Sequence, residues 1–191
     1  MMRSSIRINL VIAALVALLV VGFAAAPVAA ETRRFRSTEQ YAFRLLNCLR
    51  TGGKVTPSGA CVGYGSGRFS VYRAPLDFSQ KISNKIAFTY SSRIATAGQC
   101  RHDLGSTTDQ RFRTVGLRDD TNGENLACLW AATPRQMVVY WMRHWFKETS
   151  YGGAHWHQIK DPDFRVAGFG VARHPSGRTT LVVDFYGKRV D

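Results

Sequence analysis

The sequence is short of acidic residues and of histidine, so the candidate functional side chains can be weighed one at a time. Its 191 residues include 13 acidic and 26 basic side chains, a formal net charge of +13, and five histidines. It contains no HExxH zinc helix, no Gly-x-Ser-x-Gly nucleophile turn and no Walker phosphate loop. These absences exclude the enzyme classes that are recognised by those motifs.

Long apolar runs are also missing, apart from one at the start of the chain. Residues 1–30 have the three parts of a secretory signal: two arginines, an apolar run, and small residues at the cleavage position. We expect cleavage before Glu31, which leaves a secreted, extracellular chain of residues 31–191 with no further span. The run is nearly long enough to be an uncleaved membrane anchor, which is the alternative.

The shortage of acidic residues leaves the surface strongly basic. Residues 1–30 hold only two of the arginines, so the rest of the chain keeps this character. Such a surface attracts anionic partners such as teichoic acids, phospholipid headgroups or nucleic acids. Secreted proteins are often basic without a specific ligand, so charge alone selects no partner, and no specific nucleic acid is expected.

Cysteines are few, and all four lie after residue 30, at Cys48, Cys61, Cys100 and Cys128. An even number in an oxidising compartment predicts two disulfides, with three pairings open. Proximity in the sequence favours Cys48–Cys61 and Cys100–Cys128. The alternative, a metal cluster, lacks the close Cys-x-x-Cys spacing of zinc sites. Complete pairing would leave no thiol nucleophile.

The remaining patterns predict helices first and antiparallel strands last. Residues 51–74, rich in glycine, serine and aromatics, are expected to form a loop. Cap signals and helical spacing of apolar residues predict helices between Ser37 and Gly52 and over residues 77–97, 108–115 and 134–147. Apolar residues lie nearly all round the last of these helices, which is therefore expected to be buried between layers. β-rich runs at 165–173 and 179–186 flank a His-Pro-Ser-Gly turn, and no repeat or linker divides the chain, so we expect one α+β layered domain.

His102 and Glu124 are the first candidates for a site. His102 lies two residues after Cys100, and Glu124 lies four residues before Cys128. If these cysteines are bonded, their Cα atoms are about 5–6 Å apart. The bond would hold His102 and Glu124 in one neighbourhood, although an isolated histidine is more often structural than functional.

Glu148 and the later histidines form a second group of candidates. Glu148 lies four residues after His144, on the same face if the helix persists that far. His155 and His157 are two residues apart, which places them on one side of an extended strand or on different sides of a helix. The plain alternatives are a solvated helix end for Glu148 and surface positions for the histidines.

Gly123-Glu124-Asn125-Leu126-Ala127 is similar to the GENLA-type motif of the CAP superfamily. These SCP-like secreted domains include class 1 plant pathogenesis-related proteins, insect venom antigen 5 and many bacterial members. Further segments resemble the family in the same order: Leu46–Arg50, Pro75–Asp77, Thr133-Pro134, His155–Ile159, the bacterial-type strand segment Asp161–Ala172 and Val182–Phe185. The resemblance covers about residues 40–188, so residues 40–191 are expected to form the domain and residues 31–39 a short leader.

The resemblance implies a three-layer α-β-α sandwich with a central antiparallel sheet, and a cleft that holds two histidines and two glutamates. Carried over by position, this tetrad is His102, Glu124, Glu148 and His155. The two histidines, His102 and His155, are the candidate ligands of Zn²⁺ or another divalent cation. His144 and His157 have no counterpart in the family, and Asp184 stands where glutamine is commoner.

Three functions are open at this stage. The favoured one is a non-enzymatic module that binds a lipid, a cell-envelope polymer or a protein, with a cleft that takes a metal. The alternatives are a hydrolase whose cleft activates water and a basic ribonuclease that uses His and Glu as an acid–base pair. A lipid binder would need an apolar groove, lined by residues such as Trp145, Phe146 and Trp156.

Overall fold

The computed structural model describes residues 32–118, 121–130 and 132–190 of the chain. The signal peptide expected at residues 1–30 lies outside these residues and stays a prediction. Within the described residues, no helix combines the length and the apolar character needed to cross a membrane.

A five-stranded sheet lies at the centre of the fold, and it is built around the long hairpin of β6 (Val166–Arg173) and β7 (Arg178–Tyr186). The predicted turn closes this hairpin, where His174 N donates to Arg178 O at 2.9 Å. Every residue of β7 is buried, which fits a strand that is covered on both faces. The sequence analysis therefore placed both strands correctly.

Three more strands complete the sheet, whose order is β1-β6-β7-β5, with β4 also beside β6. β5 (Asn122–Trp130) runs antiparallel to β7, β1 (Arg33–Arg34) antiparallel to β6, and β4 (Asp77–Phe78) parallel to β6. The helix expected to begin at residue 77 therefore begins later, because Asp77 and Phe78 extend the sheet. The register pairs Glu124 of β5 with Asp184 of β7, which sets two acidic side chains next to each other.

One face of the sheet carries α3 (Gln80–Ile82), the π-helical turn η1 (Ser83–Ala87), α4 (Phe88–Ala97) and α5 (Thr108–Thr114). The first three form one continuous helical run, which ends at Gly98 in the left-handed conformation with φ +70°. The backbone of this run lies directly on β6, because a Cβ at Gly170 would be 2.2 Å from the Ala87 carbonyl carbon. Only glycine fits this approach.

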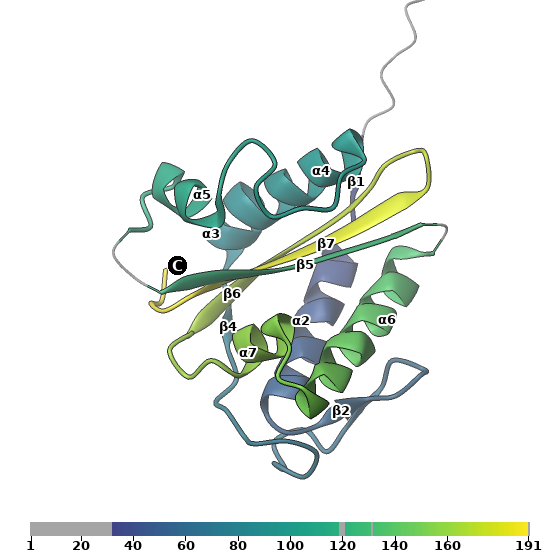
Figure 1. Cartoon of the computed structure of the whole chain (residues 1–191), viewed down its shortest axis with the longest axis vertical. Helices are drawn as coiled ribbons and strands as arrows, with labels where there is room; N and C mark the ends of the chain where they lie inside the picture. The colour runs from purple at the N-terminus through teal and green to yellow at the C-terminus, as the bar shows by residue number, and fades with distance from the viewer. Residues whose placement is uncertain (1–31, 119–120, 131, 191) are drawn as a thin grey trace, which may run out of the picture. The chain divides into compact units, whose positions relative to one another are not determined.

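The opposite face carries α2 (Arg36–Arg50), α6 (Pro134–Lys147), the short 3₁₀ turn η2 (Glu148–Ser150) and α7 (Ala154–Lys160). Figure 1 shows α2, α6 and α7 on one side of the sheet and α3, α4 and α5 on the other. The domain is thus the predicted α-β-α sandwich. The main apolar core lies between the sheet and this helical layer, with two smaller clusters under α3–α5.

Two helices of this layer differ in detail from the prediction. α6 begins with the expected capping box of Thr133 and Gln136 and proline at its first turn. It is not buried all round, since Tyr140 is 51% exposed while Met137 and Trp145 are fully buried. α2 begins at Arg36 without a side-chain cap, so Ser37 is its second residue rather than its cap.

Two cations, the buried Arg50 and the partly buried Lys160, join the end of α2 to the segment around α7. The Arg50 guanidinium donates to the carbonyl oxygens of Ala74, Ile159, Asp161 and Phe164 at 2.7–3.1 Å. Lys160 Nζ donates to Leu49 O and Arg50 O at 2.7 and 2.8 Å. Burial, helped by the charge of Arg50, lowers the pKa of Lys160 to about 8. These bonds satisfy carbonyl groups that a helix end leaves without partners.

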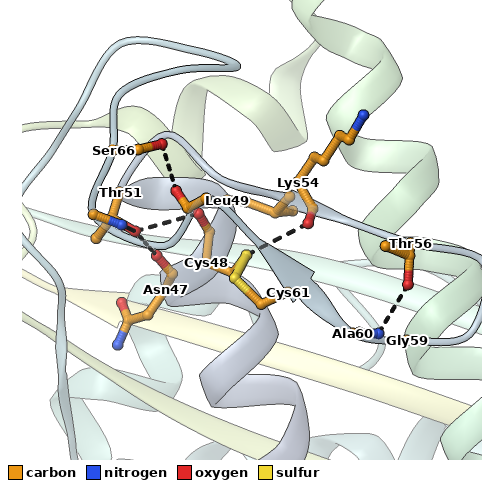
Figure 2. The surroundings of a disulfide bond; sticks show 12 residues. Asn47, Cys48, Leu49, Thr51, Lys54, Thr56, Gly59, Ala60, Cys61 and Ser66 are labelled. Atoms are coloured by element: carbon orange, nitrogen blue, oxygen red, sulfur yellow. Dashed lines mark hydrogen bonds between the residues drawn. A yellow bond between two sulfur atoms is a disulfide. The ribbon is translucent and has the colours of Figure 1, made fainter.

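Both expected disulfides are present, Cys48–Cys61 and Cys100–Cys128. The first joins the last turns of α2 to the predicted loop of residues 51–74 (Figure 2). This loop contains one short hairpin, β2 (Lys54–Val55) with β3 (Cys61–Val62). The second disulfide joins the segment after α4 to β5.

Candidate functional site

A first histidine–glutamate pair lies between β5 and the segment that follows α4. His102 Nδ1 is 2.7 Å from Glu124 Oε1. The Glu124 side chain is 1% exposed, whereas that of His102 is 53% exposed. The Cys100–Cys128 disulfide brings the two segments together, as the sequence analysis expected. The carboxylate of this pair is therefore buried, and its imidazole is accessible to solvent.

Arg111 is a third member of this group, and the sequence analysis missed it. Its Nη2 lies 2.5 Å from Glu124 Oε2, and its Nη1 donates to His102 O at 3.1 Å. Its guanidinium carbon is 3.5 Å from the centre of the Tyr90 ring. Arg111 thus holds both the carboxylate of Glu124 and the backbone of His102. The sequence predicted only the helix over residues 108–115 in which Arg111 lies, and not its contact with Glu124.

A second histidine–glutamate pair lies between η2 and α7. His155 Nδ1 is 2.7 Å from Glu148 Oε1, and Glu148 Oε2 accepts a hydrogen bond from Trp156 N at 3.1 Å. The Glu148 side chain is 5% exposed and that of His155 is 29% exposed. The His155 ring also stacks on Trp145, with centroids 5.4 Å apart. This pair repeats the pattern of the first, with the carboxylate buried and the imidazole more open.

The remaining histidines do not join these pairs through any described contact. His144 packs against Tyr140 and Trp141, with ring centroids 6.1 and 5.1 Å away, and Glu148 binds His155 instead. His157 is exposed and lies in α7, so the strand-like placement of His155 and His157 does not occur. Gly153 is the N-cap of α7, and a Cβ there would lie 2.4 Å from Glu148 Oε2.

β5 supports both pairs. Glu124 reaches His102, and the next residue, Asn125, donates from Nδ2 to His155 O at 3.0 Å. Neighbouring side chains of a strand point to opposite sides, so β5, which lies at the edge of the sheet, contacts the two pairs through its opposite faces. Gly123 lets α7 approach, because a Cβ there would be 1.9 Å from Gln158 Oε1. Three consecutive residues of the Gly-Glu-Asn motif therefore position the two pairs.

In both pairs the Nε2 atom of the imidazole is not bound by the glutamate and is available for a ligand. When Nδ1–H donates to a carboxylate, Nε2 is the basic nitrogen, through which a histidine binds a metal or accepts a proton. Carboxylate–histidine–metal arrangements of this kind are common at metal centres. Across the described residues, no group of three or more His, Cys, Asp or Glu side chains is placed to hold a metal ion. An ion bound by His102 and His155 would need its other ligands from water or from a partner.

Asp184 lies behind the first pair and is fully buried. Neither of its carboxyl oxygens has a hydrogen-bond partner among the described residues. Burial, and next the charge of Glu124, raises the pKa of Asp184 well above its usual value, although Arg111 acts in the opposite direction. The neutral, protonated acid is therefore favoured at this position.

Of the three aromatic residues expected to line a lipid groove, Trp145 cannot do so. Trp145 is fully buried in the core. Phe146 and Trp156 are partly buried and pack edge to face, with centroids 5.7 Å apart. Trp145 is therefore part of the support of His155 rather than a groove wall.

No protein-family profile matches the sequence, and no curated protein matches it either. Solved structures do match the fold. An extracellular protein containing an SCP domain from Bacillus anthracis aligns at 17% identity with a TM-score of 0.56, over 80% of this chain and 41% of its own. An outer surface protein from Borrelia burgdorferi aligns at 15% identity with a TM-score of 0.58, over 82% of this chain and 98% of its own.

A third structure, NaASP2 with Zn²⁺, aligns at 14% identity with a TM-score of 0.53, over 80% of either chain. This chain spans less than half of the Bacillus protein, so the similarity to that protein concerns one part of it. At these identities the comparisons show the fold alone. The fold is that of the SCP domain, as the resemblance to the CAP superfamily implied.

Proposed function

We propose that this chain, which has the SCP-domain fold of the CAP superfamily, is a secreted, non-enzymatic binding module whose two histidine–glutamate pairs hold a divalent cation. One observation carries the proposal: each imidazole has its Nδ1 held at 2.7 Å by a buried carboxylate. The two disulfides fit an oxidising compartment outside the cytoplasm. The bound partner would be a lipid, a cell-envelope polymer or another protein.

The glutamates of the two pairs are better suited to orienting the histidines than to coordinating an ion themselves. Glu124 and Glu148 are nearly inaccessible and already accept hydrogen bonds at both oxygens. A carboxylate in this position fixes the tautomer of the histidine and raises its basicity as a ligand. His102 and His155 would therefore supply Nε2 to the ion, and a bound ion would supply Lewis acidity for anchoring an oxygen ligand of the partner.

Zn²⁺ is the first ion to test, since the similar structure of NaASP2 was obtained with Zn²⁺. Imidazole nitrogen is also a ligand that Zn²⁺ prefers. The hydrolase and ribonuclease hypotheses stay predictions of the sequence, and no contact described above favours them over binding.

The test is Zn²⁺ titration calorimetry on the protein with both disulfides formed, together with metal analysis of the purified material. We expect stoichiometric binding that is lost in His102→Ala and in His155→Ala. Glu148→Gln should weaken binding roughly 10–100-fold, because the carboxylate that orients His155 is lost. Glu124→Gln should weaken it at least as much, because it also leaves Arg111 without its counter-charge. His157→Ala is the matched control, since His157 lies outside both pairs.

Zn²⁺ binding that survives in the His102→Ala/His155→Ala double variant would contradict the proposal. No binding by a protein whose circular dichroism shows it to be folded would do the same.

A further inference from the structure

Exposed apolar side chains gather on one loop of the domain. Val62, Tyr64, Val71 and Tyr72 are 39%, 58%, 67% and 49% exposed, and all lie within residues 62–72. The other large hydrophobic side chains exposed in the described part of the chain are Trp130, Tyr140 and Tyr151, each on a separate segment. We call the four side chains of residues 62–72 the loop patch.

The loop is anchored to the fold on both of its arms. The Cys48–Cys61 disulfide holds the first arm, and Gly65 N donates to Thr51 Oγ1 at 3.0 Å. Figure 2 shows Thr51 in this position, where its hydroxyl donates to the end of α2. On the second arm, Lys160 Nζ donates to Val71 O at 2.6 Å. The side chains of the loop patch are therefore exposed on a backbone that the disulfide and these hydrogen bonds hold in place.

The two arms of the loop also touch each other. A Cβ at Gly63 would lie 3.0 Å from the Phe69 ring, and a Cβ at Gly67 would lie 3.7 Å from Tyr72 Cβ. Residue 63 thus lies against residue 69, and residue 67 lies against residue 72. Four exposed apolar side chains on one anchored loop are therefore a candidate interaction surface.

Basic side chains border the loop patch, and residues 51–74 supply no acidic one. Residues 51–74 contain no aspartate or glutamate. Lys54 Nζ lies 4.4 Å from the centre of the Phe69 ring, and the Arg68 guanidinium carbon lies 5.2 Å from it. Lys54 and Arg68 are both exposed. Apolar and cationic groups are therefore offered together on one surface.

We propose that the loop patch docks the protein on an anionic lipid bilayer, with Tyr64, Val71 and Tyr72 entering the interface. Tyrosine rings are favoured at the level of lipid headgroups, where one end is apolar and the other is wet. Lys54 and Arg68 face the phosphates, and each basic residue near an anionic surface contributes about 1 kcal/mol. An anionic polysaccharide would satisfy the charges but offers no apolar phase for Val71. The docking requires neither the metal nor the histidine–glutamate pairs of the proposed function.

The test is flotation of the exported protein with phosphatidylcholine vesicles that contain or lack phosphatidylglycerol, in the presence of EDTA. Mass spectrometry of the N-terminus ensures that every variant is processed alike. We expect binding only to vesicles with phosphatidylglycerol, and a loss of affinity of about tenfold or more in Tyr64→Ser/Val71→Ser/Tyr72→Ser. Lys54→Gln/Arg68→Gln should weaken binding by roughly tenfold or more, and added salt should do the same to the wild type.

The matched control is Tyr140→Ser/Tyr151→Ser, which removes two tyrosines that are 51% and 68% exposed outside the loop. This control should bind vesicles like the wild type. The proposal is overturned if the loop variant floats as well as the control, or if no variant binds vesicles. It is also overturned if soluble glycerol phosphate displaces the protein as well as vesicles do, because free phosphate would then be the ligand. Because EDTA removes any metal, failure here leaves the Zn²⁺ titration unaffected.

Discussion

Replacing Glu124 with glutamine tests how the buried charges behind His102 are balanced. Glutamine keeps the shape of the side chain but removes the negative charge that lies 2.5 Å from Arg111 Nη2. The side chain of Arg111 is only 9% exposed, so water cannot replace the lost partner. The substitution leaves a buried guanidinium without its counter-charge.

The size of the effect follows from the burial of the pair. Two unit charges about 4 Å apart interact by about 4 kcal/mol at an effective dielectric constant of about 20. Breaking a buried pair by removing one partner costs roughly 3–5 kcal/mol. We therefore expect the free energy of unfolding to fall by about 3–5 kcal/mol at acidic pH, where Asp184 is neutral.

Asp184 makes this cost depend on pH. Its pKa is raised by burial and by Glu124, and Arg111 opposes the rise. A raised folded-state pKa means that stability is fully present below the unfolded value of about 3.9 and is lost as pH rises through the folded value. Without Glu124, the folded-state pKa of Asp184 falls, and its carboxylate can take the place of the lost charge beside Arg111. The cost of Glu124→Gln should therefore shrink as pH rises.

Urea unfolding of the wild type and of Glu124→Gln, at a series of pH values from about 5 to 8, measures this trend. The control is the same substitution in an Asp184→Asn background, where nothing at position 184 titrates and the cost should stay constant with pH. A cost below about 1 kcal/mol at pH 5 would refute the assigned buried ion pair. A cost that grows with pH would refute the assigned role of Asp184.

Two further predictions concern the framework of the site. Cys100→Ser/Cys128→Ser opens a loop with a sequence separation of 28 residues and should lower the free energy of unfolding by about 3–4 kcal/mol in a denaturant titration. It should also weaken Zn²⁺ binding, because His102 is no longer held beside β5; unchanged binding would show that the disulfide does not position the histidine. Gly170→Ala places a methyl group 2.2 Å from the Ala87 carbonyl carbon and should cost about 3 kcal/mol or more. A melting temperature within about 2 °C of the wild type would contradict the close contact of η1 and β6.

The positions of the cysteines were the most informative feature of the sequence for predicting the site. The pairing of Cys100 with Cys128 was sufficient to bring His102 to Glu124, because both lie a few residues from a bonded sulfur. Arg111 could not be found in this way, since its contact depends on how α5 docks against β5. Local sequence does not encode that docking distance.

The strands at the edge of the hairpin were harder to predict than β6 and β7. β5 carries polar residues that are buried, such as Glu124 and Asn125, so its pattern does not alternate as an exposed strand would. β4 has only two residues, too few for any periodicity. The sequence left open whether His155 lies in a strand or in a helix, because Gly153 caps α7 without a side-chain signal.

The bonds that close α2 also set the order in which the domain can fold. Lys160 Nζ reaches back 111 residues to Leu49 O, and Arg50 reaches forward to Phe164. A chain emerging from the ribosome therefore makes its first helix long before it makes the groups that finish that helix. Until residues near 160 are present, the carbonyl groups of Leu49, Arg50 and Val71 lack the ammonium group that binds them. We therefore expect this part of the domain to reach its final packing only after the last third of the chain has been synthesised.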